Sequence, residues 1–167
     1  MYDRLTASDI KKMEDEIEYR KLTLRPQLLE EVKETRAHGD LSENFEYHAA
    51  KRAKNKNESR IRYLDRMIRT ANVIEDNSAD DEVGMNNLVT VRFEDDGSEE
   101  TYKIVTSVRS DSLNNRITIE SPLGKALMKH KVGDVVEVCV NESVRYDVTI
   151  LKIDNNKDDS DDRIRGY

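Results

Sequence analysis

Two carboxylates three positions apart are the residues best suited to chemistry. Asp40 and Glu43 lie in the stretch 39–47, where a glycine followed by polar residues predicts a turn between two helices. Carboxylates at this spacing on a turn lie on one side and could share a hard cation such as Mg²⁺. The same pair could instead cap the next helix, with Asp40 as N-cap and Glu43 at N3. Two carboxylates alone would hold Mg²⁺ poorly, so the metal interpretation requires a partner that supplies the remaining ligands.

Two apolar stripes flank this turn and predict the helices that present it. The first stripe has spacings of 3, 4, 7 and 4, as in a heptad seam, and Pro26 within it predicts a kink or a local interruption. The two stripes would bury each other best as an antiparallel hairpin, with arms of roughly 45 Å for about 30 residues. Residues 1–75 are therefore predicted to form a long antiparallel coiled-coil finger with an acidic tip near 39–47. The stripes are Ile10, Met13, Ile17, Leu24 and Leu28, and then Phe45, Ala49, Ala53, Ile61, Leu64, Ile68 and Ala71.

The rest of the chain has a different charge and a different hydrophobic period. Residues 1–75 have a charge balance of +1 and residues 76–167 one of −8, which together give the net −7. Blocks of this kind suggest modules with separate partners. Residues 76–83 are acidic and without periodicity, which predicts a linker.

Short β-branched runs follow this linker. Together with a short helix after Ser121-Pro122, they predict a small α+β domain with an antiparallel sheet over residues 84–153. The acidic residues 154–167 are predicted to be a disordered tail. The predicted strands are 88–93, 102–106, 116–120, 134–138 and 146–151.

Composition excludes several classes of protein. Hydrophobic residues make up 36% and charged residues 38%, and no apolar run approaches the roughly 18 residues of a membrane span. The N-terminus lacks the apolar segment of a secretory signal, and a single cysteine, Cys139, excludes a disulfide framework. His38 and His48 have no third ligand nearby for zinc. We expect a soluble, cytoplasmic protein without a membrane partner.

The tip sequence resembles a known motif. Residues 39–50, Gly-Asp-Leu-Ser-Glu-Asn-Phe-Glu-Tyr-His-Ala-Ala, are similar to the tip of the bacterial Gre family of transcript cleavage factors, of the GreA type. Leu5-Thr6, Arg25-Pro26 and the segments 121–127 and 132–134 also resemble that family. The resemblance therefore spans nearly the whole chain, and the acidic tail extends beyond it.

The resemblance implies a monomeric factor that binds bacterial RNA polymerase through an FKBP-like second domain. The coiled coil would enter the secondary channel, where Asp40 and Glu43 would help to hold a second Mg²⁺, shared with the polymerase and not bound by the factor alone. The polymerase would then cleave its own backtracked RNA near the nascent 3′ end, by two-metal hydrolysis. On this interpretation the chain is not itself an enzyme.

Other residues acquire expected roles from the same resemblance. Arg36, Lys51 and Arg52 would attract RNA phosphates, although ion pairs of the basic second helix with Glu14, Glu16, Glu30 or Glu34 are an equal alternative. The segment 120–122 would contact the polymerase on the same resemblance, but it could equally be an ordinary helix start. Phe45 and Tyr47 are interpreted mainly as packing residues. The polymerase-binding segment is Glu120, Ser121 and Pro122, and the residues expected to support the tip are Gly39, Leu41, Ser42, Asn44, Glu46 and Tyr47.

Three alternative functions stay open at this stage. A protein of the same fold could occupy the secondary channel as an inhibitor without stimulating cleavage, although the intact acid pair argues against a pure plug. An FKBP-like second domain could be a chaperone or a prolyl isomerase, but fold similarity alone does not confer that activity. The chain could also be a coiled-coil adaptor, whose activity would not change when the tip acids are replaced by amides.

Overall fold

The computed structural model describes residues 3–39 and 44–166 and contains two compact units. The division between the units falls at Asn72 and Val73, and residues 4–6 belong with the second unit. A two-stranded sheet of β1 (Arg4–Leu5) and β2 (Asn72–Val73) lies at this division. In the described part of the chain, no helix is long and apolar enough to cross a membrane.

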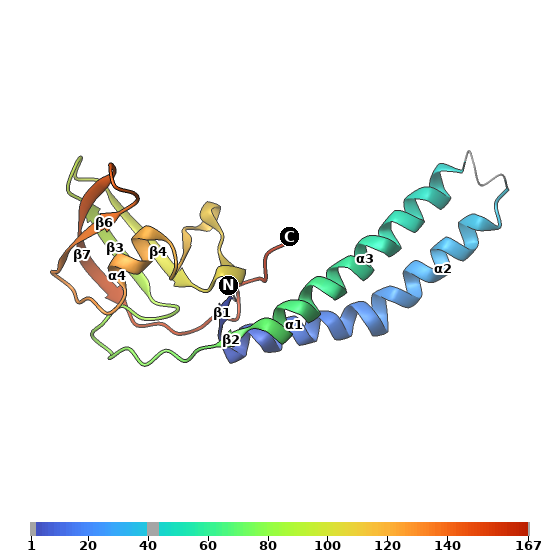
Figure 1. Cartoon of the computed structure of the whole chain (residues 1–167), viewed down its shortest axis with the longest axis horizontal. Coiled ribbons are helices and arrows are strands. Elements are labelled where there is room, and N and C mark those ends of the chain that lie inside the picture. Colours follow the sequence, from blue (N-terminus) through green and yellow to red (C-terminus); the bar gives the residue numbers. More distant parts are fainter. Residues whose placement is uncertain (1–2, 40–43, 167) are drawn as a thin grey trace. The chain divides into compact units, whose positions relative to one another are not determined.

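The first unit is a helical hairpin, which confirms the expected N-terminal helical part. One arm consists of α1 (Ala7–Tyr19), a π-helical segment (Arg20–Leu24) and α2 (Arg25–Arg36), and the other is α3 (Phe45–Thr70). The arms run side by side in opposite directions (Figure 1), and α3 packs against both α1 and α2. With 26 residues, α3 alone is about 39 Å long.

The π-helical segment lies directly before Pro26, where the sequence predicts an interruption. Proline has no N–H and its ring clashes with the carbonyl four residues back, so a regular α-helix cannot pass through this position without adjustment. The chain adjusts by widening one turn, in which the N–H of Arg25 donates to the carbonyl oxygen of Arg20, five residues back. The arm therefore continues past the proline as a helix.

The seam between the arms differs from the predicted stripe in the first half of α3. Met13, Leu28, Ile61 and Leu64 are buried as expected, but Phe45, Ala49 and Ala53 are exposed. The seam instead follows a heptad that includes polar members, and the prediction was wrong because it counted apolar residues only. The seam positions of α3 are Tyr47, Ala50, Lys54, Asn57, Ile61, Leu64 and Ile68, spaced alternately by three and four residues.

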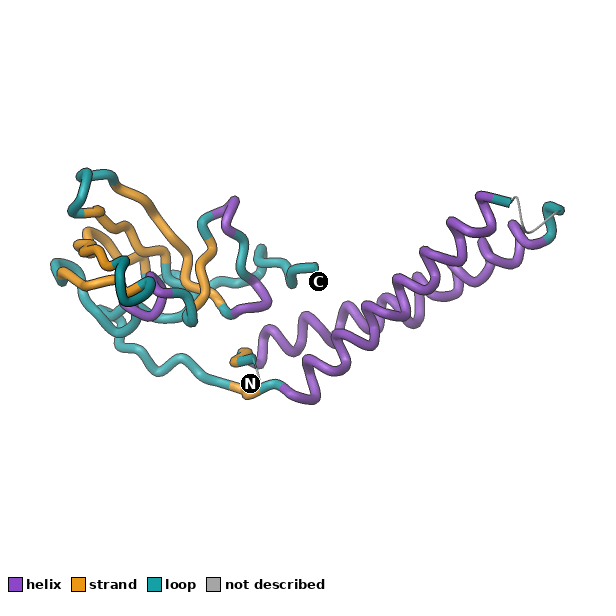
Figure 2. The backbone as a smooth tube through the Cα atoms, turned by 45° about the horizontal axis from the view of Figure 1, so that its top comes forward, coloured by secondary structure: helices purple, strands orange, loops and turns teal. Residues whose placement is uncertain are grey.

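The second unit is a small α+β domain around a five-stranded sheet (Figure 2). The strand order is β5-β4-β3-β7-β6, with β3 central. Its one α-helix in the described residues, α4 (Pro122–Leu127), contacts β5 and β6. The strands are β3 (Leu88–Phe93), β4 (Glu99–Val105), β5 (Arg116–Thr118), β6 (Val135–Cys139) and β7 (Arg145–Asp154).

The prediction of a purely antiparallel sheet was wrong in one place. Strands β4 and β5 pair in parallel, with Ile104 opposite Ile117. Between these strands the chain passes through two short 3₁₀ turns, Ser107–Arg109 and Ser112–Asn114, instead of a hairpin, so β5 enters the sheet in the direction of β4. The expected likeness to FKBP stays a prediction.

Two segments expected to lie outside the domain belong to it. In the predicted linker 76–83, Val83 is fully buried in the core, and its backbone exchanges hydrogen bonds with Lys129 and His130. The tail predicted to be disordered also packs on the second unit, since Asp162 is 3% exposed. Both predictions relied on polar composition, which does not reveal partners on other elements.

Candidate functional site

The candidate site is the turn between α2 and α3. Residues 40–43, which include Asp40, Leu41, Ser42 and Glu43, lie outside the described residues. Gly39 has φ +126°, a backbone conformation that L side chains rarely adopt. At the other side of the turn, Asn44 precedes α3 in an extended conformation.

Asn44 is the N-cap of α3 and also joins the two arms. Its Oδ1 accepts a hydrogen bond from the backbone N–H of Tyr47 at 3.0 Å, and its Nδ2 donates to the carbonyl oxygen of Thr35 at 2.6 Å. This corrects the alternative in which Asp40 and Glu43 form the capping pair, because both residues precede the cap in the chain. The helix start therefore does not require either carboxylate.

Two aromatic residues at the start of α3 have different environments. Tyr47 is 8% exposed, and the Arg36 guanidinium lies over its ring at 5.7 Å from the centroid. A hydrogen bond with Arg36 lowers the pKa of the Tyr47 phenol and outweighs the effect of burial. Phe45 is 84% exposed, so its interpretation as a packing residue was wrong, whereas that of Tyr47 is confirmed.

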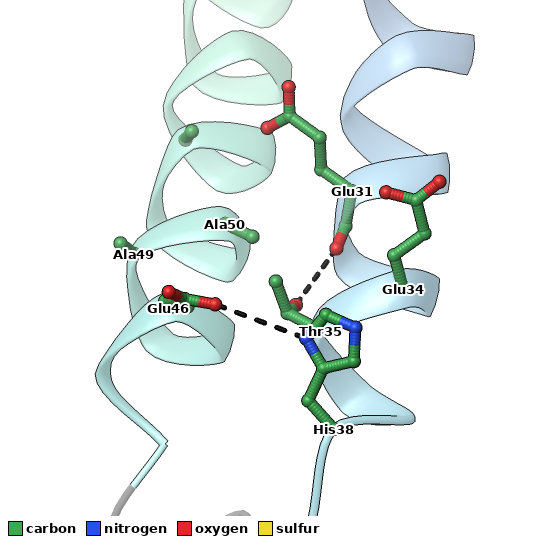
Figure 3. A pocket seen from close by; sticks show the side chains of 8 residues that line it. Glu31, Glu34, Thr35, His38, Glu46, Ala49 and Ala50 are labelled. Atoms are coloured by element: carbon green, nitrogen blue, oxygen red, sulfur yellow. Dashed lines mark hydrogen bonds and ion pairs between the residues drawn. The ribbon is translucent and has the colours of Figure 1, made fainter.

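A groove of about 480 Å³ lies between the arms next to the turn. Its lining combines small residues of α3, such as Ala50, with the acidic side chains of Glu31, Glu34 and Glu46 (Figure 3). His38 Nδ1 lies 3.9 Å from a carboxylate oxygen of Glu46. The carboxylates make the groove itself electronegative. Among the described residues, no group of three or more His, Cys, Asp or Glu side chains is placed to hold a metal ion.

The basic residues expected to attract RNA are exposed near the turn. Lys51 and Arg52 take part in no ion pair within the described ranges, and Arg36 is exposed while it covers Tyr47. Farther along α3, Arg60 forms a cross-helix ion pair with Glu16 at 2.9 Å. The ion-pair alternative is therefore confirmed at Arg60, whereas attraction of RNA by Arg36, Lys51 and Arg52 stays a prediction.

The segment expected to contact the polymerase begins α4. Ser121 is the N-cap, and its hydroxyl accepts from the Gly124 N–H at 3.0 Å and donates to the carbonyl oxygen of Thr118 at 2.7 Å. Glu120 accepts a hydrogen bond from Arg4 Nε at 2.9 Å. Pro122 is exposed at the first helical position. The helix-start interpretation accounts for Ser121, and Pro122 is left as the exposed member.

The sequence analysis missed two groups of residues. One is the polar part of the seam, in which Asn57 and Arg60 are buried against α1 and the π-helical segment. The other is a cluster around Arg109 and Asp162, both almost completely buried. The heptad spacing of Asn57 from Ile61 and Leu64 was the available signal for the first group. The second joins residues 53 positions apart and had no local signal.

Comparison with protein families gives matches over both units. Residues 4–73 match the family model described as "Transcription elongation factor, N-terminal", and residues 77–155 match "Transcription elongation factor, GreA/GreB, C-term".

Curated relatives match over most of their length. "Transcription elongation factor GreA" of Thermoanaerobacter pseudethanolicus is 44% identical over 135 residues, which cover 80% of this chain and 86% of the relative. The protein of the same name from Chloroherpeton thalassium is 38% identical and covers 89% of this chain and 96% of the relative. Among solved structures, Gfh1 of Thermus thermophilus is 22% identical with a TM-score of 0.43, over 92% of this chain and 99% of that one. At this TM-score, the structural likeness supports no conclusion.

Proposed function

The chain belongs to the GreA/GreB family of transcription elongation factors, and on this basis we propose that it binds bacterial RNA polymerase and stimulates that enzyme's own cleavage of backtracked RNA. The hairpin would reach through the secondary channel of the polymerase, as the resemblance of the tip motif implies. The chain would contribute carboxylates to the reaction and would perform no cleavage alone.

The observation that carries this proposal is the role of Asn44. Because Asn44 caps α3 and ties it to α2, the start of the helix is stabilised without Asp40 or Glu43. These two carboxylates would then have no capping role, and they would supply the hard oxygen ligands that Mg²⁺ prefers. A Mg²⁺ ion held jointly with the polymerase would stabilise negative charge at the phosphate that is cleaved. The two carboxylates would position that ion beside the RNA.

The flanking charges support the same arrangement. Lys51 and Arg52 are exposed on α3, and Arg36 lies at the end of α2, so three cations surround the turn. Their attraction for RNA phosphates would be sensitive to salt. The second unit would supply the grip on the polymerase, with the exposed Pro122 at the start of α4 as part of the contact.

The proposal is tested with stalled, backtracked bacterial polymerase complexes. Wild-type protein is compared with Asp40→Asn, Glu43→Gln and the control Glu30→Gln, which removes the same charge from an exposed site on α2. We expect wild type and control to release short 3′ RNA fragments, and each tip variant to reduce the release rate by about 10- to 100-fold. Binding of all four proteins to the polymerase should agree within about twofold.

Two results would contradict the proposal. Cleavage that survives in both tip variants would show that the carboxylates do not take part in the reaction. Binding of wild-type protein to the polymerase without any RNA cleavage would instead favour a protein that only occupies the channel.

A further inference from the structure

The C-terminal segment 155–166 is a folded part of the second unit, and all of it after residue 155 lies beyond the family match. Its backbone carbonyls accept hydrogen bonds from side chains of the domain, among them Lys103 Nζ to the oxygen of Asp158 at 2.8 Å. Farther along, the Arg165 N–H donates to the carbonyl oxygen of Val108 at 2.8 Å. The segment is therefore attached to the domain on both sides of Asp162.

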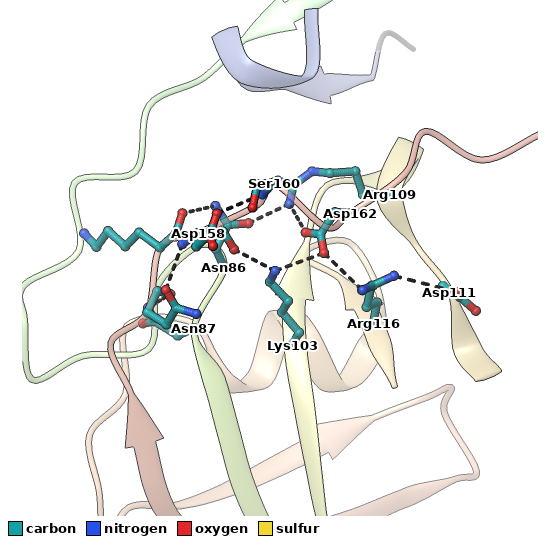
Figure 4. Close-up of polar contacts among 11 residues, drawn as sticks. Asn86, Asn87, Lys103, Arg109, Asp111, Arg116, Asp158, Ser160 and Asp162 are labelled. Carbon is teal, nitrogen blue, oxygen red and sulfur yellow. Dashed lines mark hydrogen bonds and ion pairs between the residues drawn. The ribbon is translucent and has the colours of Figure 1, made fainter. Parts of the chain in front are cut away.

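Asp162 is the centre of this attachment (Figure 4). Its carboxylate lies 2.7 Å from Arg109 Nη1, 3.0 Å from Lys103 Nζ and 3.1 Å from Arg116 Nε. The side chains of Asp162 and Arg109 are both fully buried. Three cations thus converge on one carboxylate, and they come from β4, from the first 3₁₀ turn and from β5.

Two of the three cations also contact groups of the domain outside the tail, whereas the contacts of Lys103 are with the tail itself. Arg109 Nη1 also donates to Asn86 Oδ1 at 2.6 Å, and Arg116 Nη1 lies 3.8 Å from a carboxylate oxygen of Asp111. A buried guanidinium without an anion is strongly unfavourable, so an empty site would favour a replacement for Asp162. Two guanidinium groups and one ammonium group that point at one position are suited to a phosphate group, whose oxygens accept several charge-assisted hydrogen bonds.

A hollow of about 450 Å³ lies next to this site. Arg116 lines the hollow and also contacts Asp162, so it connects the outer space with the buried carboxylate. The tail contributes Arg163 and Arg165 to the same lining, while Ser110 and Asn114 add polar groups from the domain. The carboxylates of Asp111 and Asp161 line the hollow as well, so a phosphate group that enters here meets three arginine side chains beside two acidic ones.

We propose that Lys103, Arg109 and Arg116 form an oxoanion-binding site, that Asp162 is its built-in occupant, and that a phosphate group competes with the C-terminal tail for this site. The tail is then a latch: when phosphate occupies the site, residues 155–166 detach from the domain. The phosphate could belong to RNA or be free in solution. This inference does not depend on the proposed action at RNA polymerase.

The latch is tested with full-length Asp162→Asn beside Asp161→Asn. The control removes the same charge from the neighbouring exposed residue, which lines the hollow but forms no ion pair among the described residues and does not touch the three cations. Limited trypsin digestion, followed by mass spectrometry, reports cleavage at Lys157, Arg163 and Arg165. Asp162→Asn should accelerate tail cleavage by at least about tenfold, because it weakens three charged hydrogen bonds, and Asp161→Asn should match wild type.

The site is tested by titration with inorganic phosphate, observed through the arginine Nε–H signals in NMR spectra. Asp162→Asn should bind phosphate at least about tenfold more tightly than wild type and Asp161→Asn. The double variant Asp162→Asn/Arg116→Gln should lose this gain. Short single-stranded RNA with and without a 5′-phosphate distinguishes the sources: tighter binding of the phosphorylated RNA alone indicates a terminal phosphate, and equal binding indicates the backbone.

Wild-type protein provides a test that needs no variant to fold. Phosphate should accelerate trypsin cleavage of the tail, whereas chloride at matched ionic strength should not. Equal effects of the two salts would overturn the proposal. So would release of the tail in Asp162→Asn without a gain in phosphate binding, which would leave Asp162 as a packing residue only.

Discussion

The side-chain amide of Asn44 bridges the two arms of the hairpin, since its Nδ2 donates to the carbonyl oxygen of Thr35 at 2.6 Å while its Oδ1 caps α3. The last carbonyls of a helix and the first N–H groups of the next one have no partners within their helices. One residue therefore satisfies a group at each of the two helix ends that meet at the tip.

Removing one or both of the hydrogen bonds of Asn44 should lower the free energy of unfolding by different amounts. Asn44→Asp keeps the acceptor for Tyr47 but removes the donor to Thr35, whereas Asn44→Ala removes both. We expect Asn44→Ala to lower the free energy of unfolding by about 1–2 kcal/mol and Asn44→Asp to lower it by less. Urea unfolding followed by helix circular dichroism measures both, with the exposed Asn55→Ala as control. Equal losses in the two Asn44 variants would show that the cap on Tyr47 contributes nothing, and an unchanged Asn44→Asp would show the same of the bridge to Thr35.

Local signals were sufficient for much of the fold. The helices, the interruption before Pro26 and most strands follow from hydrophobic period and from proline chemistry, which act within a few residues. The parallel placement of β5 did not follow, because it depends on the path of the 3₁₀ turns between Val105 and Arg116. The tail was misread for a similar reason: Asp162 is one of several aspartates in the sequence, and its three cationic partners lie 46 to 59 positions away.

For the candidate site, the sequence predicted the position of the turn but not the residue that caps α3. The tip motif located the turn, and the position of Gly39 agrees with its positive φ. Sequence spacing could not decide which residue caps α3, because Asp40 and Asn44 are both good N-cap residues. The backbone decides this in favour of Asn44, whose conformation is extended while Phe45 is already helical. The same helix start determines that Phe45 faces solvent and Tyr47 faces the other arm.

Replacing Phe45 and Tyr47 in turn by alanine tests which of the two aromatic rings packs in the seam between the arms. Tyr47 is buried beside Arg36, and Phe45, two residues away, is 84% exposed. Tyr47→Ala should lower the free energy of unfolding by about 2 kcal/mol, because it removes buried apolar area. Phe45→Ala should change it by less than about 0.5 kcal/mol. Urea unfolding of both variants measures these changes. A larger loss of unfolding free energy for Phe45→Ala would mean that its ring packs within the folded chain.

The buried Asn57 should resist replacement by an apolar residue. Its Oδ1 accepts from Arg20 Nη1 at 2.9 Å, and its Nδ2 donates to the Arg20 carbonyl oxygen at 3.2 Å, within the π-helical segment. Asn57→Leu leaves Arg20 without these partners and should cost about 1–3 kcal/mol. The exposed Asn55→Leu should change stability by less than about 0.5 kcal/mol. A more stable Asn57→Leu variant would show that the seam favours an apolar residue over this network.

The ion pair between Arg25 and Glu58 should make the hairpin sensitive to acid. Arg25 Nε and Nη2 donate to the two carboxylate oxygens of Glu58 at 2.7 and 2.8 Å, and the hydrogen bond from Arg25 lowers the pKa of Glu58 despite its partial burial. A carboxyl group whose pKa is lower in the folded state stabilises the fold above its unfolded pKa of about 4.3, and this contribution is lost as the pH falls through the folded pKa. Glu58→Gln should therefore be less stable than wild type near pH 7, and the difference should shrink near pH 3, whereas Glu30→Gln should show no such change. Unfolding curves at both pH values measure the stability difference between wild type and Glu58→Gln. If this difference stays the same at low pH, the ion pair is excluded as its cause.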